Sequence, residues 1–385
     1  MFDRSNLNAT FATEIFQLLD NVTAPFDPLN VTTIQWLGER EDISTFYEAF
    51  TSEGNCLTFN MLAEEEILRY SDARKNSSRP SSKSHKWSLE KGYPSGDNYD
   101  AFPRRTFMPG LEGGLTIDSI YTNNSHLDHF CKGSLHGFKV TLHHPCELPN
   151  MDKYFRLPLN EALFVGIKPS LIMVSDELLN YPPKTRKCYF ENEKYLSSYN
   201  IYTQQNCLDE CLANYTVEQC ACVPIYLAMP ENETKICGLA EMECVKWSKL
   251  KYLEMESSSN KSGGERCDCL PSCTSLTYDV ELSQTDWSWG KTYAVKKHLE
   301  NKTDLNPNNT HLSYLSIYYK DLQFLSSERK ELYGSLEFFS NTGGLLGLFF
   351  GFSIISLIEL VHFLTVRILC NIRMYGRNAW SGHFN

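Results

Sequence analysis

The longest apolar stretch of the chain lies close to its C-terminus. Residues 338–358 contain no Asp, Glu, Lys or Arg, and the apolar run continues past Glu359 to Val366. A helix of about 20 residues crosses the hydrocarbon core of a bilayer. We therefore predict one transmembrane helix over residues 338–366, with a buried core helix as the alternative.

The rest of the chain alternates apolar and polar positions in short runs. Residues 137–142 and 312–324 alternate as strands do, and residues 64–70 fit a short helix. Residues 71–100 are rich in Ser, Lys, Arg and Gly, which is typical of an exposed loop. No internal repeat is visible.

The charges around the apolar run predict its orientation. Arg367, Arg373 and Arg377 follow it, and no acidic residue comes after them. Positively charged loops stay on the cytoplasmic side. We therefore expect a cytoplasmic tail over residues 367–385 and an extracellular domain over residues 1–337.

The start of the chain does not fit this topology alone. Residues 1–6 carry no apolar core of a signal peptide, and a single C-terminal anchor is poorly suited to export a large domain. We therefore expect that an N-terminal piece, most simply a first transmembrane helix, is missing from this chain.

Composition supports an extracellular location. The net charge of −11 argues against a nucleic-acid partner. Thirteen of the 14 cysteines lie before residue 274, and this density fits an oxidising compartment. Acceptor motifs for N-glycosylation, Asn-x-Ser/Thr, all lie before residue 311, although such short motifs also arise by chance. They begin at Asn8, Asn21, Asn30, Asn76, Asn123, Asn214, Asn232, Asn260, Asn301 and Asn308.

A block of ten cysteines extends from Cys188 to Cys273. The even number suits disulfide bridges, whose pairing cannot be deduced from spacing alone. A zinc site is the less favoured alternative, because Cys-x2-Cys pairs and clustered histidines are absent from the block.

Small residues line one face of the predicted membrane helix. Gly343, Gly347 and Gly351 recur at every fourth position, and Ser340 extends the series by one turn. A glycine inside a helix costs about 1 kcal/mol relative to alanine, so the series needs a reason. Close packing of helices is one, and a face along a narrow aqueous path is the other.

Glu359 is a charged residue within the predicted span. Such a residue is expected to face water or a partner rather than lipid. Snorkelling, or pairing with an arginine near the membrane boundary, is the alternative.

Four motifs occur in an order that resembles the degenerin/epithelial sodium channel superfamily, and most of all its insect pickpocket branch. They are Gly-Asn-Cys-Leu-Thr-Phe-Asn at 54–60, Gly-Phe-Lys-Val-Thr-Leu-His at 137–143, the cysteine spacing of 188–273, and Gly-Leu-Phe-Phe-Gly-Phe-Ser at 347–353. Residues 1–50 and 71–130 match weakly.

The resemblance implies an α+β fold. Residues 1–337 would form an extracellular domain like that of acid-sensing channels, with a palm β-sheet, a variable finger-like loop region at 71–130 and a disulfide-rich helical thumb at 188–273. Residues 338–366 would form a transmembrane pore helix, followed by the cytoplasmic tail. The bridges implied by the family are Cys188–Cys273, Cys207–Cys269, Cys211–Cys267, Cys220–Cys244 and Cys222–Cys237.

The remaining cysteines are treated separately. The family's counterpart of Cys56 pairs with a cysteine just after the first membrane helix, which this chain does not contain. Cys131 and Cys146 flank the strand at 137–142 and are candidates for a bridge. Cys370 is expected to be a free cytoplasmic thiol.

The resemblance also implies roles in the membrane segment. Gly351, Phe352 and Ser353 would form the selectivity filter, where oxygen dipoles replace the hydration water of an ion. The family often has a small residue in the middle position, and Phe352 departs from that. The gate region would hold Ser340, Asn341, Gly343, Gly344 and Gly347, with Ser340 at the position where bulky residues keep degenerin-type channels open. Glu359 would lie near the inner mouth of the pore.

The implied function is that of a subunit of a sodium-selective, amiloride-sensitive cation channel in the plasma membrane. A single pore helix cannot enclose a pore, and the family is trimeric, so we expect a homo- or heterotrimer in the lipid bilayer. Sodium would be the permeant ion, and neither a cofactor nor a bound metal is expected. The gating stimulus is not readable.

Three alternatives remain. The chain is a single-pass receptor or adhesion ectodomain, or a truncated subunit that does not conduct. The third, an enzyme, is the least favoured: the paired His143 and His144 have no nucleophile motif beside them, and we expect them on a strand surface.

Overall fold

The computed structural model describes residues 10–11, 15–16, 19, 26–27, 29, 31–69, 87–94, 101–127, 135–230, 234–257, 267–300 and 305–376. The chain divides into two compact units, Met1–Arg329 and Lys330–Asn385. The predicted α+β fold class is confirmed in the first unit, which combines a mixed sheet with helices and five disulfides.

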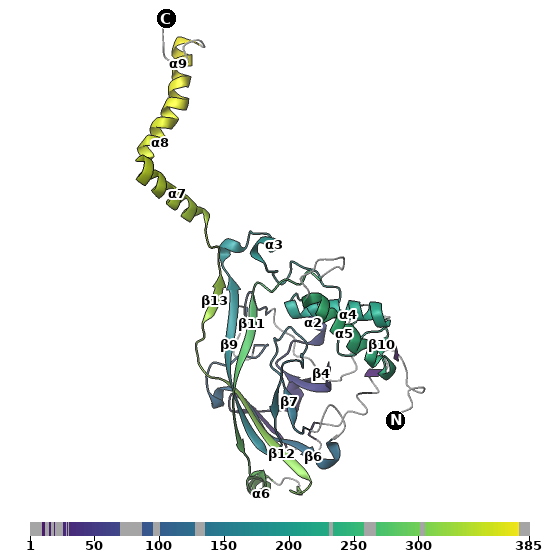
Figure 1. Ribbon diagram of the computed structural model, residues 1–385. Helices are drawn as coiled ribbons and strands as arrows, with labels where there is room; N and C mark the ends of the chain where they lie inside the picture. Colours follow the sequence, from purple (N-terminus) through teal and green to yellow (C-terminus); the bar gives the residue numbers. More distant parts are fainter. Residues whose placement is uncertain are drawn as a thin grey trace. The chain divides into compact units, whose positions relative to one another are not determined.

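A seven-stranded sheet forms the frame of the first unit. Its strand order is β11-β9-β12-β6-β2-β3, and β13 also pairs with β9. Figure 1 shows the long strands β9, β11 and β12 side by side. The strands are β2 (Thr33–Trp36), β3 (Glu39–Glu41), β6 (Leu115–Asn123), β9 (Glu161–Val174), β11 (Ser275–Asp286), β12 (Thr310–Tyr319) and β13 (Ser326–Arg329).

Three two-stranded ladders and several helices accompany the sheet. The ladders pair β4 (Phe46–Thr51) with β5 (Gly54–Phe59), β7 (Phe138–Val140) with β8 (Phe155–Leu157), and β1 (Thr10–Phe11) with β10 (Ile236–Cys237). The α-helices whose bounds the described residues give are α2 (Glu64–Ile67), α3 (Pro183–Arg186), α4 (Gln204–Cys220), α5 (Met242–Ser257) and α6 (Trp289–Glu300).

Alternation along β9 builds the main core. Leu163, Val165 and Ile167 occupy every second position and are all buried, as expected for side chains on one face of a strand. They pack with Ile117 of β6 and Leu315 of β12 in one hydrophobic cluster. Burial of each such side chain contributes about 1.5–3 kcal/mol, so this face fixes the register of the central strands.

The thumb-like segment is a pair of helices held by bridges. Helix α4 starts at Thr203, whose hydroxyl accepts a hydrogen bond from the amide of Asn206 at 3.1 Å, and it ends where Ala221 adopts a left-handed conformation with φ 56°. The bridges in the described residues are Cys188–Cys273, Cys207–Cys269, Cys211–Cys267, Cys220–Cys244 and Cys222–Cys237. These are the pairs that the resemblance implies, and each stabilises by about 2–4 kcal/mol, mainly through the unfolded chain.

The expected loop region at 71–130 contains a central strand. Parts of this region lie outside the described residues, but β6 (Leu115–Asn123) pairs with β2 and β12 inside the sheet. Its Leu115 and Ile117 are buried in the main core. The expectation of a variable loop is therefore wrong for β6, whose alternating side chains have a core to face.

The expectation for the two histidines is also wrong. His144 is buried, and the Nε2 atom of His143 lies 2.8 Å from the hydroxyl of Thr58. Burial lowers the pKa of His143, and together with the neighbouring His143 it lowers the pKa of His144 to about 4. Both rings are therefore neutral at physiological pH and serve as hydrogen-bonding parts of the core.

The structure gives no support for the suggested bridge between Cys131 and Cys146. Cys131 lies outside the described residues, and Cys146 is a free thiol buried in a cluster that includes Leu62 and Leu148. Burial raises the pKa of this thiol well above its ordinary value. Cys146 is therefore a packing residue rather than a bridging one.

Asp209 on α4 gives the first unit a pH-dependent stability. Burial is the main reason that the pKa of this carboxyl is raised to about 7. The Gln205 amide, which donates to Oδ1 at 2.9 Å, and Lys249 oppose the shift, and the nearby Glu147 and Asp152 add to it. Between about pH 4 and pH 7 the folded state therefore binds a proton that the unfolded chain does not bind. Acidification through this window stabilises the fold, and the gain is lost as the pH rises through 7.

We predict that Asp209→Asn raises the free energy of unfolding at pH 8 by about 1–3 kcal/mol and has little effect near pH 4. The reason is that Asn keeps an acceptor for Gln205 without the buried charge. Equilibrium urea unfolding between pH 4 and pH 8, with the bridges intact, measures the effect. Glu218→Gln on the exposed face of the same helix is the matched control. If the free energy of unfolding of Asp209→Asn depended on pH as strongly as that of the unchanged chain, the assignment would be contradicted.

Candidate functional site

The second unit holds the apolar run predicted to cross the membrane. It contains α7 (Ser335–Phe350), α8 (Ile354–Val361), a π-helical turn (His362–Val366) and α9 (Arg367–Tyr375). Within the described part of the chain, the continuous helix Ile354–Tyr375 is the one that is long and apolar enough to span a bilayer. Its 22 residues correspond to about 33 Å at 1.5 Å per residue.

The predicted helix over 338–366 is interrupted at residues 351–353. Gly351 adopts φ +62° and ends α7, and the amide of Phe352 donates to the carbonyl of Leu346 at 3.3 Å. Glycine enters this left-handed conformation without the steric cost that a Cβ brings. Figure 1 shows the bend between α7 and α8 that follows.

The break changes the glycine series. Gly343 and Gly347 lie in α7 and share a face, whereas Gly351 is the residue that terminates the helix. The expectation that all three lie on one continuous helical face is therefore wrong. The cause is that glycine suits both helical and left-handed backbone, so its spacing alone does not separate the two.

Ser353 opens the next helix. Its hydroxyl accepts a hydrogen bond from the amide of Ser356 at 3.3 Å, and its own amide donates to the hydroxyl of Ser356 at 3.4 Å. This reciprocal arrangement is an N-terminal cap. Ser353 therefore fixes the point at which α8 begins after the break.

The break exposes backbone oxygens. The last four carbonyls of an α-helix lack intrahelical partners, and that end carries partial negative charge. In hydrocarbon such groups are tolerated only where they contact protein or water. The break at Gly351–Ser353 lies inside the apolar run of residues 338–366 and directly before the helix Ile354–Tyr375, so it can present oxygens to a cation on an aqueous path.

The glycines of α7 are not explained by contacts inside this chain. A Cβ built on Gly343 or Gly344 would meet nothing within 4 Å, and one on Gly347 would meet the carbonyl oxygen of Phe352 at 3.6 Å, an ordinary contact. The chain itself therefore leaves room for side chains at these positions. The lack of side chains at these glycines therefore indicates a constraint from outside the chain, such as a neighbouring helix or a narrow passage.

The other predicted residues lie on the same helices. Ser340 and Asn341 are exposed on α7, and the Asn341 amide donates to the hydroxyl of Tyr333 at 3.0 Å. The sequence pattern gave no signal for Tyr333, because its hydrogen bond to Asn341 joins residues eight positions apart. Among the described residues, no arginine pairs with Glu359: Glu359 is exposed on α8, and Arg367 lies over the ring of Phe363 at 5.1 Å.

Three of the glycosylation candidates fall on described residues. Asn214 is exposed on α4, Asn308 is exposed before β12, and Asn123 is partly buried and accepts a hydrogen bond from Ser125 at 3.2 Å. The other candidates, from Asn8 to Asn301, lie outside the described residues. Asn308 and Asn214 thus have the accessibility that modification needs.

Comparison with known proteins agrees with these features. The profile of the family described as "Amiloride-sensitive sodium channel" matches residues 3–363. Pickpocket protein 28 of Drosophila melanogaster is 33% identical over 346 residues, which cover 87% of this chain and 56% of that protein. The alpha subunit of the epithelial sodium channel of Cavia porcellus is 22% identical over 285 residues, 71% of this chain and 40% of that protein. Acid-sensing ion channel 4-B of Danio rerio is 25% identical over 234 residues, 59% of this chain and 38% of that protein. The chain therefore spans about half the length of these relatives, or less.

We predict that Gly351→Ala closes part of the break. A left-handed conformation costs an alanine about 1–2 kcal/mol. The equilibrium between the broken and the continuous helix therefore shifts roughly tenfold toward the continuous one. The amides of residues 351–356 should then exchange with deuterium about ten times more slowly, as mapped by mass spectrometry of the chain in lipid nanodiscs. Gly344→Ala, which adds the same methyl group to open space inside α7, should leave these amides unchanged. Equal exchange in both variants would show that Gly351 does not cause the break.

Proposed function

The chain belongs to the amiloride-sensitive sodium channel family, and we propose that it supplies the pore-lining part of a sodium-selective cation channel subunit. The observation that carries the proposal is the break at Gly351–Ser353. It frees carbonyl oxygens in the middle of an apolar segment, where only water, protein or an ion can satisfy them.

The proposed filter consists of backbone oxygens around Gly351, Phe352 and Ser353. Gly351 supplies the conformation and Ser353 the cap that fixes the next helix. Rings of carbonyl oxygens replace hydration water around a permeant cation. One chain provides only one part of such a ring, so the proposal includes a trimer of this or related subunits around a common axis.

The proposed gate lies on α7, and the inner mouth on α8. Ser340, Gly343 and Gly347 leave a narrow surface on which neighbouring helices approach, since side-chain volume on that face is minimal. Glu359, exposed and without an ion-pair partner among the described residues, provides a negative charge that attracts cations below the filter. In this arrangement residues 1–337 are extracellular, the tail after 366 is cytoplasmic, and the channel is located in the plasma membrane.

The thumb-like segment is proposed to carry the stimulus. Three of the five bridges start on α4, and one of these, Cys220–Cys244, ties α4 to α5. They limit the internal motion of the two helices, which therefore respond as a stiff body. Amiloride block is included in the proposal because the matching family carries that description.

The rival is a single-pass receptor or adhesion domain. It accounts for the bridges and the glycosylation motifs. It gives no reason for glycines with open space around them or for a break inside the apolar segment. These two features favour the channel.

The test is the current carried by the full-length protein that contains this chain. We expect an inward sodium current in oocytes that amiloride reduces, with a reversal potential that follows the sodium gradient. A protein that reaches the cell surface, alone and with pickpocket-type partners, and carries no current would support the receptor or a non-conducting subunit.

We predict that Ser340→Phe raises the resting current several-fold in this assay, because a bulky ring on the small-residue face of α7 prevents the helices from closing together. Two-electrode voltage clamp in the absence of any stimulus measures it. The control is Ser335→Phe at the start of the same helix, which should leave the resting current unchanged. Equal currents in both variants would remove Ser340 from the gate.

A further inference from the structure

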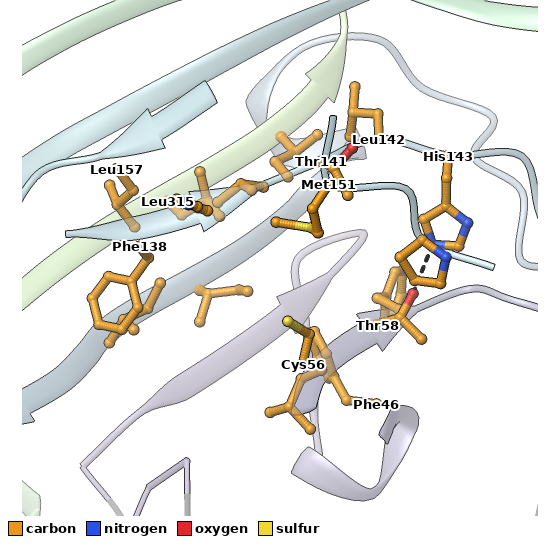
Figure 2. Close-up of a pocket in the computed structure, with 18 of the residues that line it drawn as sticks. Phe46, Cys56, Thr58, Phe138, Thr141, Leu142, His143, Met151, Leu157 and Leu315 are labelled. Atoms are coloured by element: carbon orange, nitrogen blue, oxygen red, sulfur yellow. Dashed lines mark hydrogen bonds between the residues drawn. The ribbon is translucent and has the colours of Figure 1, made fainter. Parts of the chain in front are cut away.

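A cavity of about 1460 Å³ lies within the first unit. Its walls come from the β4–β5 hairpin, from the β7–β8 segment and from the strands β6, β9 and β12 of the central sheet. Figure 2 shows Cys56 and Thr58 of β5, Met151 of the β7–β8 connection, Phe138 of β7 and Leu315 of β12 around this space. These pieces are far apart in the sequence, and only the fold brings them together.

Most of the wall is apolar. The side chains that contribute include those of Leu57, Phe138, Val140, Leu157 and Leu315. Small-molecule sites in proteins measure about 300–1,000 Å³ and combine an apolar lining with a few placed polar groups. The cavity is large enough for a molecule of that class with water beside it.

Two cations face each other on the β7–β8 ladder. Lys139 and Arg156 are directly paired across the two strands, and both line the cavity. The Lys139 ammonium lies 4.9 Å, and the Arg156 guanidinium 5.7 Å, from the centre of the Tyr154 ring. Like charges directly opposite each other in a ladder are destabilising, so this pair favours the approach of anions.

The protein supplies one anion for the two cations. Glu53, at the tip of the β4–β5 hairpin, pairs with Lys139 at 2.7 Å. Arg156 donates to the carbonyl of Leu135 at 3.4 Å, and no carboxylate of the described residues lies within ion-pair distance of it. A guanidinium can hold a carboxylate through two parallel hydrogen bonds, and Arg156 retains that capacity.

The other acidic side chains of the wall are engaged elsewhere. Both oxygens of Asp27 accept backbone amides, those of Val31 at 2.9 Å and Thr32 at 2.8 Å. Glu48 accepts from the amide of Asn55 at 3.3 Å. Both carboxylates therefore accept hydrogen bonds from amide donors, whereas among the cations of the wall Arg156 is the one that no described carboxylate pairs with.

We propose that this cavity binds an apolar molecule with a single carboxylate, of the fatty-acid type. Its carboxylate binds Arg156 beside Lys139, and its apolar body packs between the β4–β5 hairpin and the central sheet. The proposal concerns the first unit alone and does not depend on conduction.

The experiment uses the whole chain in lipid nanodiscs and a twelve-carbon fatty acid with a photoreactive diazirine. After illumination, peptide mapping should place adducts on the segments 54–59 and 138–157. Excess dodecanoate should reduce them several-fold, and dodecanol, which lacks the charge, should reduce them far less. Adducts confined to residues 335–375 would mean partition into the bilayer and would overturn the proposal, as would equal competition by dodecanol.

Two variants separate the charge from the space. Arg156→Gln should raise the probe concentration that gives half-maximal labelling about tenfold. Lys153 is an exposed cation of the same segment outside the cavity, so Lys153→Gln should leave this concentration unchanged. Val140→Phe keeps every charge and fills part of the cavity, so it should lower the maximum labelling. Intact bridges and an unchanged melting temperature establish that each variant is folded, and unchanged labelling in folded Arg156→Gln and Val140→Phe would refute the site.

Discussion

The ladder along strand β9 is the constraint on which the first unit depends. Over twelve consecutive residues β9 pairs antiparallel with β11, and on its other edge it pairs parallel first with β12 and then with β13. Parallel pairing requires a long crossover rather than a tight turn, so distant parts of the chain must return to the same strand. The buried face of β9 then fixes the register of these neighbours, because a shift of one residue would turn Leu163 and Val165 toward solvent. The same face provides one wall of the cavity.

Much of this frame could be predicted from local pattern. The alternation at residues 312–324 marked the strand that became β12 (Thr310–Tyr319), and an even set of cysteines indicated bridges. Resemblance, not spacing, implied the pairs now present in the structure. What failed depended on contacts across long sequence separations. His143 is held by Thr58 from 85 residues away, and β6 has a core to face only because β2 and β12 close on it. No local signal contains such partners.

The candidate site divides in the same way. Composition placed the small residues in the right segment, but the break itself rests on one dihedral angle at Gly351. Glycine adopts left-handed and right-handed backbone with similar ease, so a four-residue spacing was compatible with a straight helix and with a broken one. Ser353 is ambiguous in the same way: a serine suits a pore lining, and it equally suits the N-terminal cap that the structure gives it. The cavity had no signal at all, because its walls come from many stretches that lie far apart in the sequence.

The break also addresses the position at which this chain departs from its family's pattern. Phe352 stands where a small residue is common, and a bulky side chain would obstruct a filter that was made of side chains. In the proposed filter the coordinating groups are backbone carbonyls, and their direction is set by Gly351 on one side and by the cap of Ser353 on the other. The amide of Phe352 donates back to Leu346, which ties its backbone to the end of α7. Because the backbone is fixed on both sides of Phe352, its ring can point away from the axis of the proposed pore without moving the carbonyl oxygens. The requirement for small side chains then falls on Gly343 and Gly347, where neighbouring helices must approach, rather than on the middle of the filter.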